Sequence, residues 1–172
     1  MTMPHVARAA APSALLGKSV VLSISESRLS RPVAGGPATN SSAQTQLSVY
    51  VSSAGRPFVR SNRTLTTGRR GAETKAIDTA PGGNIGVSTA SNVSFSGNAM
   101  TVTLAMTSGA RRIMVNFDAS YSTCSASAIT AREGGKNLVI RNRYTGENRE
   151  VLSTQFSVNS CGIKSGNVFS GE

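Results

Sequence analysis

Apolar and polar residues alternate with a period of two over most of the chain after residue 17. The clearest segment is 46–52, where Leu47, Val49 and Val51 fall on one side and polar or aromatic residues on the other. Successive side chains of a strand point to opposite faces of a sheet, so this pattern is typical of strands with one buried face. No window keeps the 3.6-residue apolar spacing of an amphipathic helix. The sequence therefore predicts an all-β fold.

Short turn signals containing Gly, Asn or Pro separate the alternating segments. Strands are expected over residues 19–29, 46–52, 57–63, 92–96, 99–107, 111–118, 122–130, 137–144 and 149–158. Short connections favour antiparallel neighbours, which indicates an up-and-down meander of about eight or nine strands. Closure hides the edges of such a sheet completely, so we expect a closed or partly closed, lipocalin-like barrel. A β-sandwich is the alternative.

The chain is long enough for one domain, which we expect to cover residues 17–172. Residues 1–16 are expected to be a disordered tail or the remnant of a signal peptide, because the first fourteen residues end in small residues but lack an apolar stretch. Residues 66–91 are rich in Gly, Thr and Ala and are expected to form a long flexible loop. No apolar run reaches the roughly 18 residues of a transmembrane helix, so no membrane span is predicted.

The two cysteines, Cys124 and Cys161, lack the CxxC spacing of a metal or redox motif. An even number of cysteines without that spacing favours one structural disulfide, with two free thiols as the alternative. A disulfide would place the protein in an oxidising compartment. We therefore expect an exported, periplasmic or extracellular protein, and a cytoplasmic one if the thiols are free.

The chain is strongly basic, with 18 Lys and Arg against 8 Asp and Glu and a formal net charge of +10. Such a charge attracts anionic partners. Folding could gather Arg56, Arg60, Arg63, Arg111 and Arg112 into an anion-binding site. Tyr50 and Phe58 nearby could add a stacking platform for single-stranded nucleic acid. The alternative is that these charges are dispersed and protect edge strands from aggregation.

Few residues are suited to catalysis. His5 is the only histidine, so a histidine base, a histidine zinc site and a catalytic triad each lack their central residue. Glu26 is in phase with the apolar positions of the first strand and is a candidate buried acid, or else it pairs with Arg28 at the exposed end. Asp118 ends a predicted strand and is expected to be a turn residue. We therefore predict no catalytic site, no metal site and no cofactor.

Several segments resemble small exported bacterial all-β proteins of unknown function. The resemblance rests on residues 17–28 (GKSVVLSISESR), 48–58 (SVYVSSAGRPF), 96–101 (SGNAMT), 109–118 (GARRIMVNFD), 160–161 (SC) and 165–169 (SGNVF). It implies export and carries no activity. Together with the composition, it predicts a non-catalytic exported module of the bacterial envelope with a binding or structural role. The alternatives are a basic β-barrel that binds nucleic acid or another anionic polymer, and a lipocalin-like barrel that binds a small ligand.

Overall fold

The computed structural model describes residues 9–67, 73–78, 93–106, 109–130, 138–141 and 145–168. These residues form one 3-10 turn and ten strands, which confirms the all-β prediction: η1 (Ser13–Leu15), β1 (Lys18–Pro32), β2 (Thr39–Val51), β3 (Pro57–Thr67), β4 (Glu73–Asp78), β5 (Val93–Ser96), β6 (Ala99–Met106), β7 (Gly109–Phe117), β8 (Cys124–Thr130), β9 (Val139–Arg141) and β10 (Asn148–Ser165). None of the described residues forms a helix that is long and apolar enough to cross a membrane.

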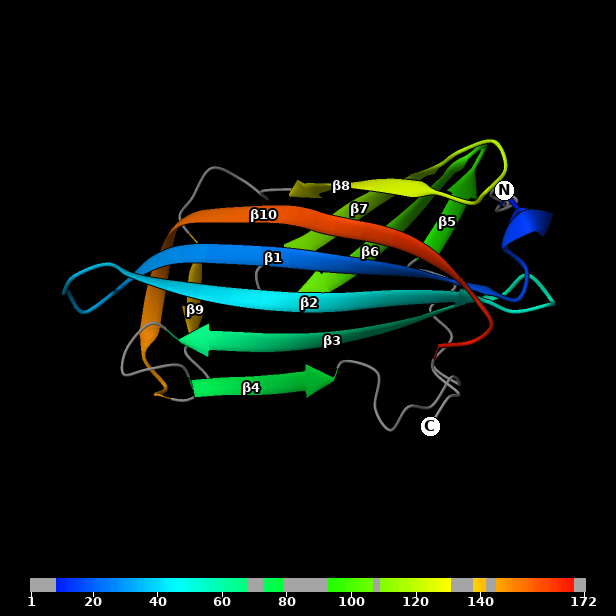
Figure 1. Ribbon diagram of the computed structural model, residues 1–172. Helices are drawn as coiled ribbons and strands as arrows, with labels where there is room; N and C mark the ends of the chain where they lie inside the picture. Colours follow the sequence, from blue (N-terminus) through cyan, green and yellow to red (C-terminus); the bar gives the residue numbers. More distant parts are fainter. Residues whose placement is uncertain are drawn as a thin grey trace, which may run out of the picture.

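The strands form two antiparallel sheets (Figure 1). The six-stranded sheet has the order β4-β3-β2-β1-β10-β9, and the four-stranded sheet has the order β5-β6-β7-β8. Within each sheet consecutive strands pair as hairpins, as predicted for a meander, but β10 returns to pair with β1. Both strand orders have two ends, so the described strands form open sheets. The predicted closed, lipocalin-like barrel is not confirmed.

The hydrophobic core lies between the two sheets, as in a β-sandwich. It contains alternate residues of five strands: Val20, Leu22 and Ile24 of β1, Leu47, Val49 and Val51 of β2, Val93 and Phe95 of β5, Met100 and Val102 of β6, and Ile113, Val115 and Phe117 of β7. The alternation that predicted the strands therefore also identified which of their faces is buried.

The boundaries of the domain and of its loops differ from those expected. Leu15 is fully buried in the core, so the folded domain begins before residue 17. The segment 66–91, expected to be a loop, includes the end of β3 and all of β4. Residues 68–72 and 79–91 of that segment lie outside the described residues. Strand β4 was missed because its apolar residues are few, and pairing with β3 supplies its hydrogen bonds.

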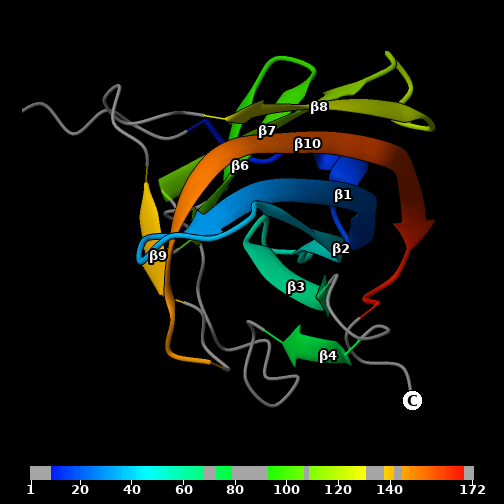
Figure 2. The ribbon, with the colours of Figure 1, turned by 90° about the vertical axis from the view of Figure 1, so that its left-hand side faces the viewer.

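Strands β1, β2 and β10 extend beyond their expected limits. The β1–β2 hairpin continues past the last apolar pairs through a polar ladder, in which Ser25 pairs with Gln44 and Ser27 with Ser42. Strand β10 pairs with β1 along its whole length, with register shifts that mark bulges, and it bends sharply near its start (Figure 1). Strand β8 lies alongside β10 in both views (Figures 1 and 2), so the two sheets meet along this side.

Candidate binding surface on the six-stranded sheet

The outer face of the six-stranded sheet, which points away from the core, is lined mainly by hydroxyl and amide side chains. It consists of the residues of β1, β2, β3 and β10 that alternate with the buried ones. Its hydroxyl and amide members include Ser23, Ser25, Ser27, Ser42, Gln44, Gln46, Ser48, Ser153, Gln155 and Ser157, all exposed or half-buried. Serine and glutamine at these positions leave one face of a long sheet solvated while the other face forms the core.

Hydrogen bonds between neighbouring strands hold part of this surface in place. The Ser25 hydroxyl donates to Oε1 of Gln44 at 3.1 Å, and the Ser27 hydroxyl donates to Oε1 of Gln155 at 3.4 Å. Asn159 in turn donates its amide N–H to the Ser25 hydroxyl. Each glutamine uses its carbonyl oxygen in these bonds and retains an NH₂ group with two donors. The surface therefore presents ordered donors and acceptors to a ligand.

A groove of about 570 Å³ lies at the end of the six-stranded sheet where the β1–β2 hairpin runs beside β10. Its lining contains one apolar residue and no charged residue: Ser27, Leu29, Asn40, Ser41, Ser42, Ser153 and Gln155. The groove is a partly open depression and not an enclosed pocket. A lining of hydroxyl and amide groups suits a neutral ligand that carries many hydroxyl groups of its own.

Two aromatic rings lie at the opposite end of the outer face. Tyr50 and Phe58 are cross-strand partners, and their rings are stacked with centroids 6.4 Å apart and an interplanar angle of 23°. Both rings are half-buried, and neither belongs to the core. Val59, the residue between Phe58 and Arg60, points the other way and packs against the core. Half-buried Arg60 follows Phe58 on the outer face. Stacked rings on a sheet surface form a flat apolar platform.

The five arginines predicted to form an anion-binding site do not form one cluster. Arg56 and Arg60 lie at or near the start of β3, and Arg63 lies further along that strand. Arg111 and Arg112 belong to β7 in the other sheet, where Arg112 is exposed and alternates with buried core residues. The side chains of Arg63 and Arg111 lie outside the described part of the structure. Arg60 and Arg112 therefore point to opposite sides of the sandwich.

Glu26 is buried, as its position in the apolar repeat predicts, with 6% of its surface exposed. Its Oε1 lies 3.0 Å from Nη2 of Arg28, which combines the two interpretations given for this residue. The neighbouring Ser30 accepts hydrogen bonds from Arg149 at both its hydroxyl and its carbonyl oxygen. This end of the inner face is thus a polar network of paired groups, and Glu26 has a structural partner there.

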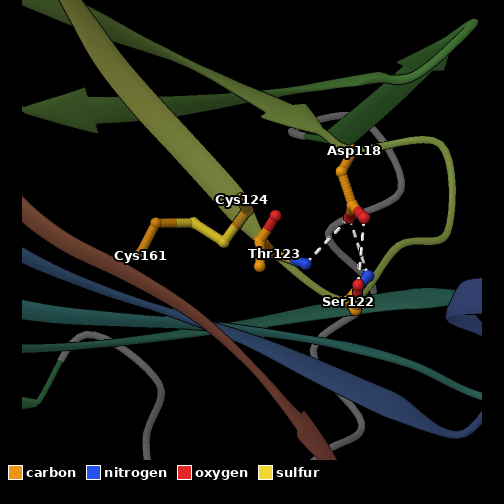
Figure 3. The surroundings of a disulfide bond; sticks show 5 residues. All are labelled: Asp118, Ser122, Thr123, Cys124 and Cys161. Atoms are coloured by element: carbon orange, nitrogen blue, oxygen red, sulfur yellow. Dashed lines mark hydrogen bonds between the residues drawn. A yellow bond between two sulfur atoms is a disulfide. The ribbon is translucent and has the colours of Figure 1, made fainter.

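Asp118 closes the turn between β7 and β8, as predicted (Figure 3). Its Oδ1 accepts backbone N–H bonds from Ser122 at 2.7 Å and Thr123 at 2.8 Å. Its Oδ2 accepts from the hydroxyl groups of Ser120 and Ser122. These bonds favour the carboxylate, with the Ser120 hydroxyl the strongest influence, and they hold the pKa of Asp118 well below its usual range. The carboxylate therefore orders a turn.

Cys124 and Cys161 form a disulfide, as predicted (Figure 3). Their Cα atoms are 5.6 Å apart, and the bond joins β8 of the four-stranded sheet to β10 of the six-stranded sheet. The half-buried cysteines pack against the edge of the core. This is a covalent connection at the side where the two sheets meet without a shared ladder.

Among the described residues, no group of three His, Cys, Asp or Glu side chains comes close enough to hold a metal ion. The only histidine, His5, lies outside them. No protein family, curated protein or solved structure matches the chain. The fold and the surface chemistry therefore carry the functional argument.

Sequence reasoning missed the groove because its polar residues resemble a loop. Residues 39–45 contain no run of large apolar side chains, and Arg31-Pro32 before them suggested that the strand had ended. The alternation of polar and apolar residues along the neighbouring strand could have located this polar face. Ser23, Ser25 and Ser27 alternate with Leu22, Ile24 and Glu26, which makes them one continuous polar face.

Proposed function

We propose that this chain is a non-catalytic exported module of the bacterial envelope that binds its ligand on the outer face of the six-stranded sheet. The observation that carries the proposal is the uncharged groove of about 570 Å³ lined by hydroxyl and amide groups. Its strands are held by long ladders to β1, so the backbone that carries the polar groups is fixed before a ligand arrives, and the Ser27 hydroxyl donates to Gln155. Fixed groups lose little conformational entropy on binding.

The disulfide supports export. Structural disulfides persist in the periplasm and outside the cell and are rare in the cytosol of mesophiles. Cys124 and Cys161 join two sheets through a half-buried contact, which is a structural position. An exported protein of the envelope meets polymers rich in hydroxyl groups, and the groove offers matching donors and acceptors.

The acids near the ends of the described strands support a non-catalytic role. Glu26 is paired with Arg28, and the Asp118 carboxylate accepts hydrogen bonds from its own turn. A general acid or base needs an accessible proton and a pKa near the working pH. The lowered pKa of Asp118 keeps this carboxyl group ionised at neutral pH, so Asp118 is not suited to act as a general acid.

The experiment has two readouts on natively expressed protein. The first is the intact mass before and after reduction with alkylation, measured in separate cytoplasmic, periplasmic and extracellular fractions. The second is co-sedimentation of the purified protein with insoluble envelope polysaccharide. We expect an oxidised protein outside the cytoplasm that sediments with the envelope material. Free thiols in the cytoplasmic fraction would overturn the export component.

Groove variants then locate the binding surface. Gln155→Ala removes a polar group of the groove, and Arg112→Gln changes the exposed outer side of the other sheet. We expect about a three- to ten-fold weaker retention for Gln155→Ala, which corresponds to the loss of one hydrogen bond. Arg112→Gln should leave retention unchanged. Equal retention of the two variants would place the binding surface elsewhere.

A further inference from the structure

All three glutamines of the chain lie on the outer face of the six-stranded sheet. Gln44 and Gln46 belong to β2 and Gln155 belongs to β10, and each side chain is exposed. Strands β2 and β10 flank β1 on its two sides (Figure 1), so the pairing of β1 with both neighbours brings the three amides onto one surface. An amide side chain offers a carbonyl acceptor and two N–H donors. This face is therefore suited to a ligand that has both donors and acceptors.

The cross-strand neighbours of the glutamines form a continuous polar strip. We define the polar strip as the outward positions 23, 25, 27 and 29 of β1 with their partners on β2 and β10. Its members are Ser23, Ser25, Ser27, Leu29, Asn40, Ser42, Gln44, Gln46, Ser153, Gln155, Ser157 and Ser160. None of these residues is charged, although the chain contains 18 basic and 8 acidic residues. A ligand on the strip is therefore held by neutral hydrogen bonds and not by ion pairs.

The polar strip is longer than it is wide. Positions 23 and 29 of β1 are six residues apart, which corresponds to about 20 Å along the strand, whereas three neighbouring strands are about 10 Å across. The partly open groove occupies the end around Ser27 and Leu29. Beyond the groove the strip continues with Ser25 and Gln44 and then with Ser23 and Gln46. This shape suits an extended chain whose middle units lie in the open groove.

Leu29 is the one apolar member of the polar strip. It is half-buried in the groove, between its cross-strand partners Asn40 and Ser153. A pyranose ring has C–H groups on its faces and hydroxyl groups around its edge. Contact between those C–H groups and Leu29 would remove apolar surface from water, while the partners on either side bond the hydroxyl groups. An apolar centre with polar neighbours therefore matches a sugar ring.

We propose that the polar strip binds an extended neutral polysaccharide through an internal segment of the polymer. This inference rests on the proposed function and names its ligand class and binding mode. One sugar ring packs on Leu29 in the groove, and the adjoining units bond the serine and glutamine side chains toward Ser23. Each neutral hydrogen bond replaces one to water and stabilises the complex only a little. The affinity therefore builds up over several sugar units and is negligible for a short fragment.

An acidic polymer fits the polar strip less well. Beyond Leu29 on β1, Arg31 is already joined to Glu150 by an ion pair at 2.7 Å. A carboxylate placed on the strip would lose part of its hydration and gain no charge-assisted hydrogen bond from the strip side chains. The net charge of +10 attracts any polyanion at low salt, so the comparison requires a physiological ionic strength.

The test measures dissociation constants of the oxidised full chain at about 0.15 M ionic strength. The probes are cellohexaose, cellobiose and the cellohexaose analogue in which each C6 carbon is oxidised to a carboxylate. We expect cellohexaose to bind with an affinity that does not change as salt is added. The oxidised analogue should bind at least about ten-fold more weakly, and cellobiose should bind at least about thirty-fold more weakly because it forms fewer hydrogen bonds.

Three variants locate the binding surface. Leu29→Ser removes the apolar contact in the groove, and Gln44→Ala removes an amide of the strip outside the groove. Each should weaken cellohexaose binding by about three- to ten-fold. Asn116→Ala removes an exposed amide from the outer side of β7 in the other sheet and should change binding by less than about two-fold. Circular dichroism and thermal melting check that each variant is folded.

Four results would overturn the inference. These are no binding of cellohexaose, equal affinity for cellobiose, equal or tighter binding of the oxidised analogue, and equal effects of Gln44→Ala and Asn116→Ala. Sedimentation with envelope polysaccharide by a protein that does not bind cellohexaose would refute this ligand class and leave the proposed function standing. Cellohexaose binding by a protein found only in the cytoplasmic fraction would refute export and leave this inference standing.

Discussion

Removing the disulfide should destabilise the protein by a predictable amount. Cys124 and Cys161 are 37 residues apart in the sequence, and the bond restricts the unfolded chain. The chain-entropy relation gives about 4 kcal/mol for a loop of this length. A domain of this size is stable by only about 5–15 kcal/mol, so the loss is a large fraction of the total. The double variant Cys124→Ala, Cys161→Ala should therefore remain folded but be much easier to unfold.

Equilibrium unfolding in urea measures this loss. With a slope of about 2 kcal/mol per molar urea, the midpoint should fall by about 2 M. The melting temperature should fall by about 10 °C. As a control, adding a reducing agent should lower the stability of the wild-type protein and have no effect on the stability of the double variant. A loss below about 1 kcal/mol would refute the reasoning, because it would mean that the bond does not restrict the unfolded state.

Three further predictions concern individual positions. The pKa of Asp118 is lower in the folded protein than in the unfolded chain, so the Asp118 carboxylate contributes to stability above about pH 4 and this contribution is lost as the pH falls below that value. Asp118→Asn should therefore reduce the acid-induced drop in melting temperature between about pH 5 and pH 2. Leu22→Ala should cost about 2–5 kcal/mol in urea unfolding because Leu22 is fully buried, whereas Ser23→Ala on the outer face should change stability by less than about 0.5 kcal/mol. Glu26→Ala should lower the free energy of unfolding by about 3 kcal/mol because it leaves the partly buried Arg28 without this carboxylate. Polysaccharide binding should not change at a temperature where the variant is still folded. A folded Glu26 variant with impaired binding would instead point to a functional acid.

Local periodicity predicted most strands but not how the sheets are assembled. Alternation identified Val20, Leu22 and Ile24 as one buried face, and the structure confirms it. Whether the two sheets join into one depends on pairings such as β8 with β10, which are far apart in the sequence. No local pattern specifies that pairing. The structure places the two strands side by side and joins them through Cys124 and Cys161 while leaving them in separate sheets.

The candidate site shows the same division between local and long-range information. The sequence places Tyr50, Phe58 and Arg60 close together because a short turn connects their strands, and the structure confirms the ring pair. It could not separate them from Arg112, because membership of a sheet depends on long-range pairing. The groove was missed because residues 39–45 resemble a loop and because Ser153 and Gln155 of β10 come to lie beside β1 only through long-range pairing.

The pairing of β1 with β10 has a mechanical consequence. Lys18 pairs with Ser165, so the chain enters β1 and leaves β10 at the same end of the sheet. A pull applied to both ends would therefore peel the two strands apart one pair at a time, which resists force less than sliding them past each other. Peeling reaches Cys161 at the fifth position of β1, where Leu22 is its partner. From there the tension passes through the sulfur atoms into β8, so the four-stranded sheet is loaded as well.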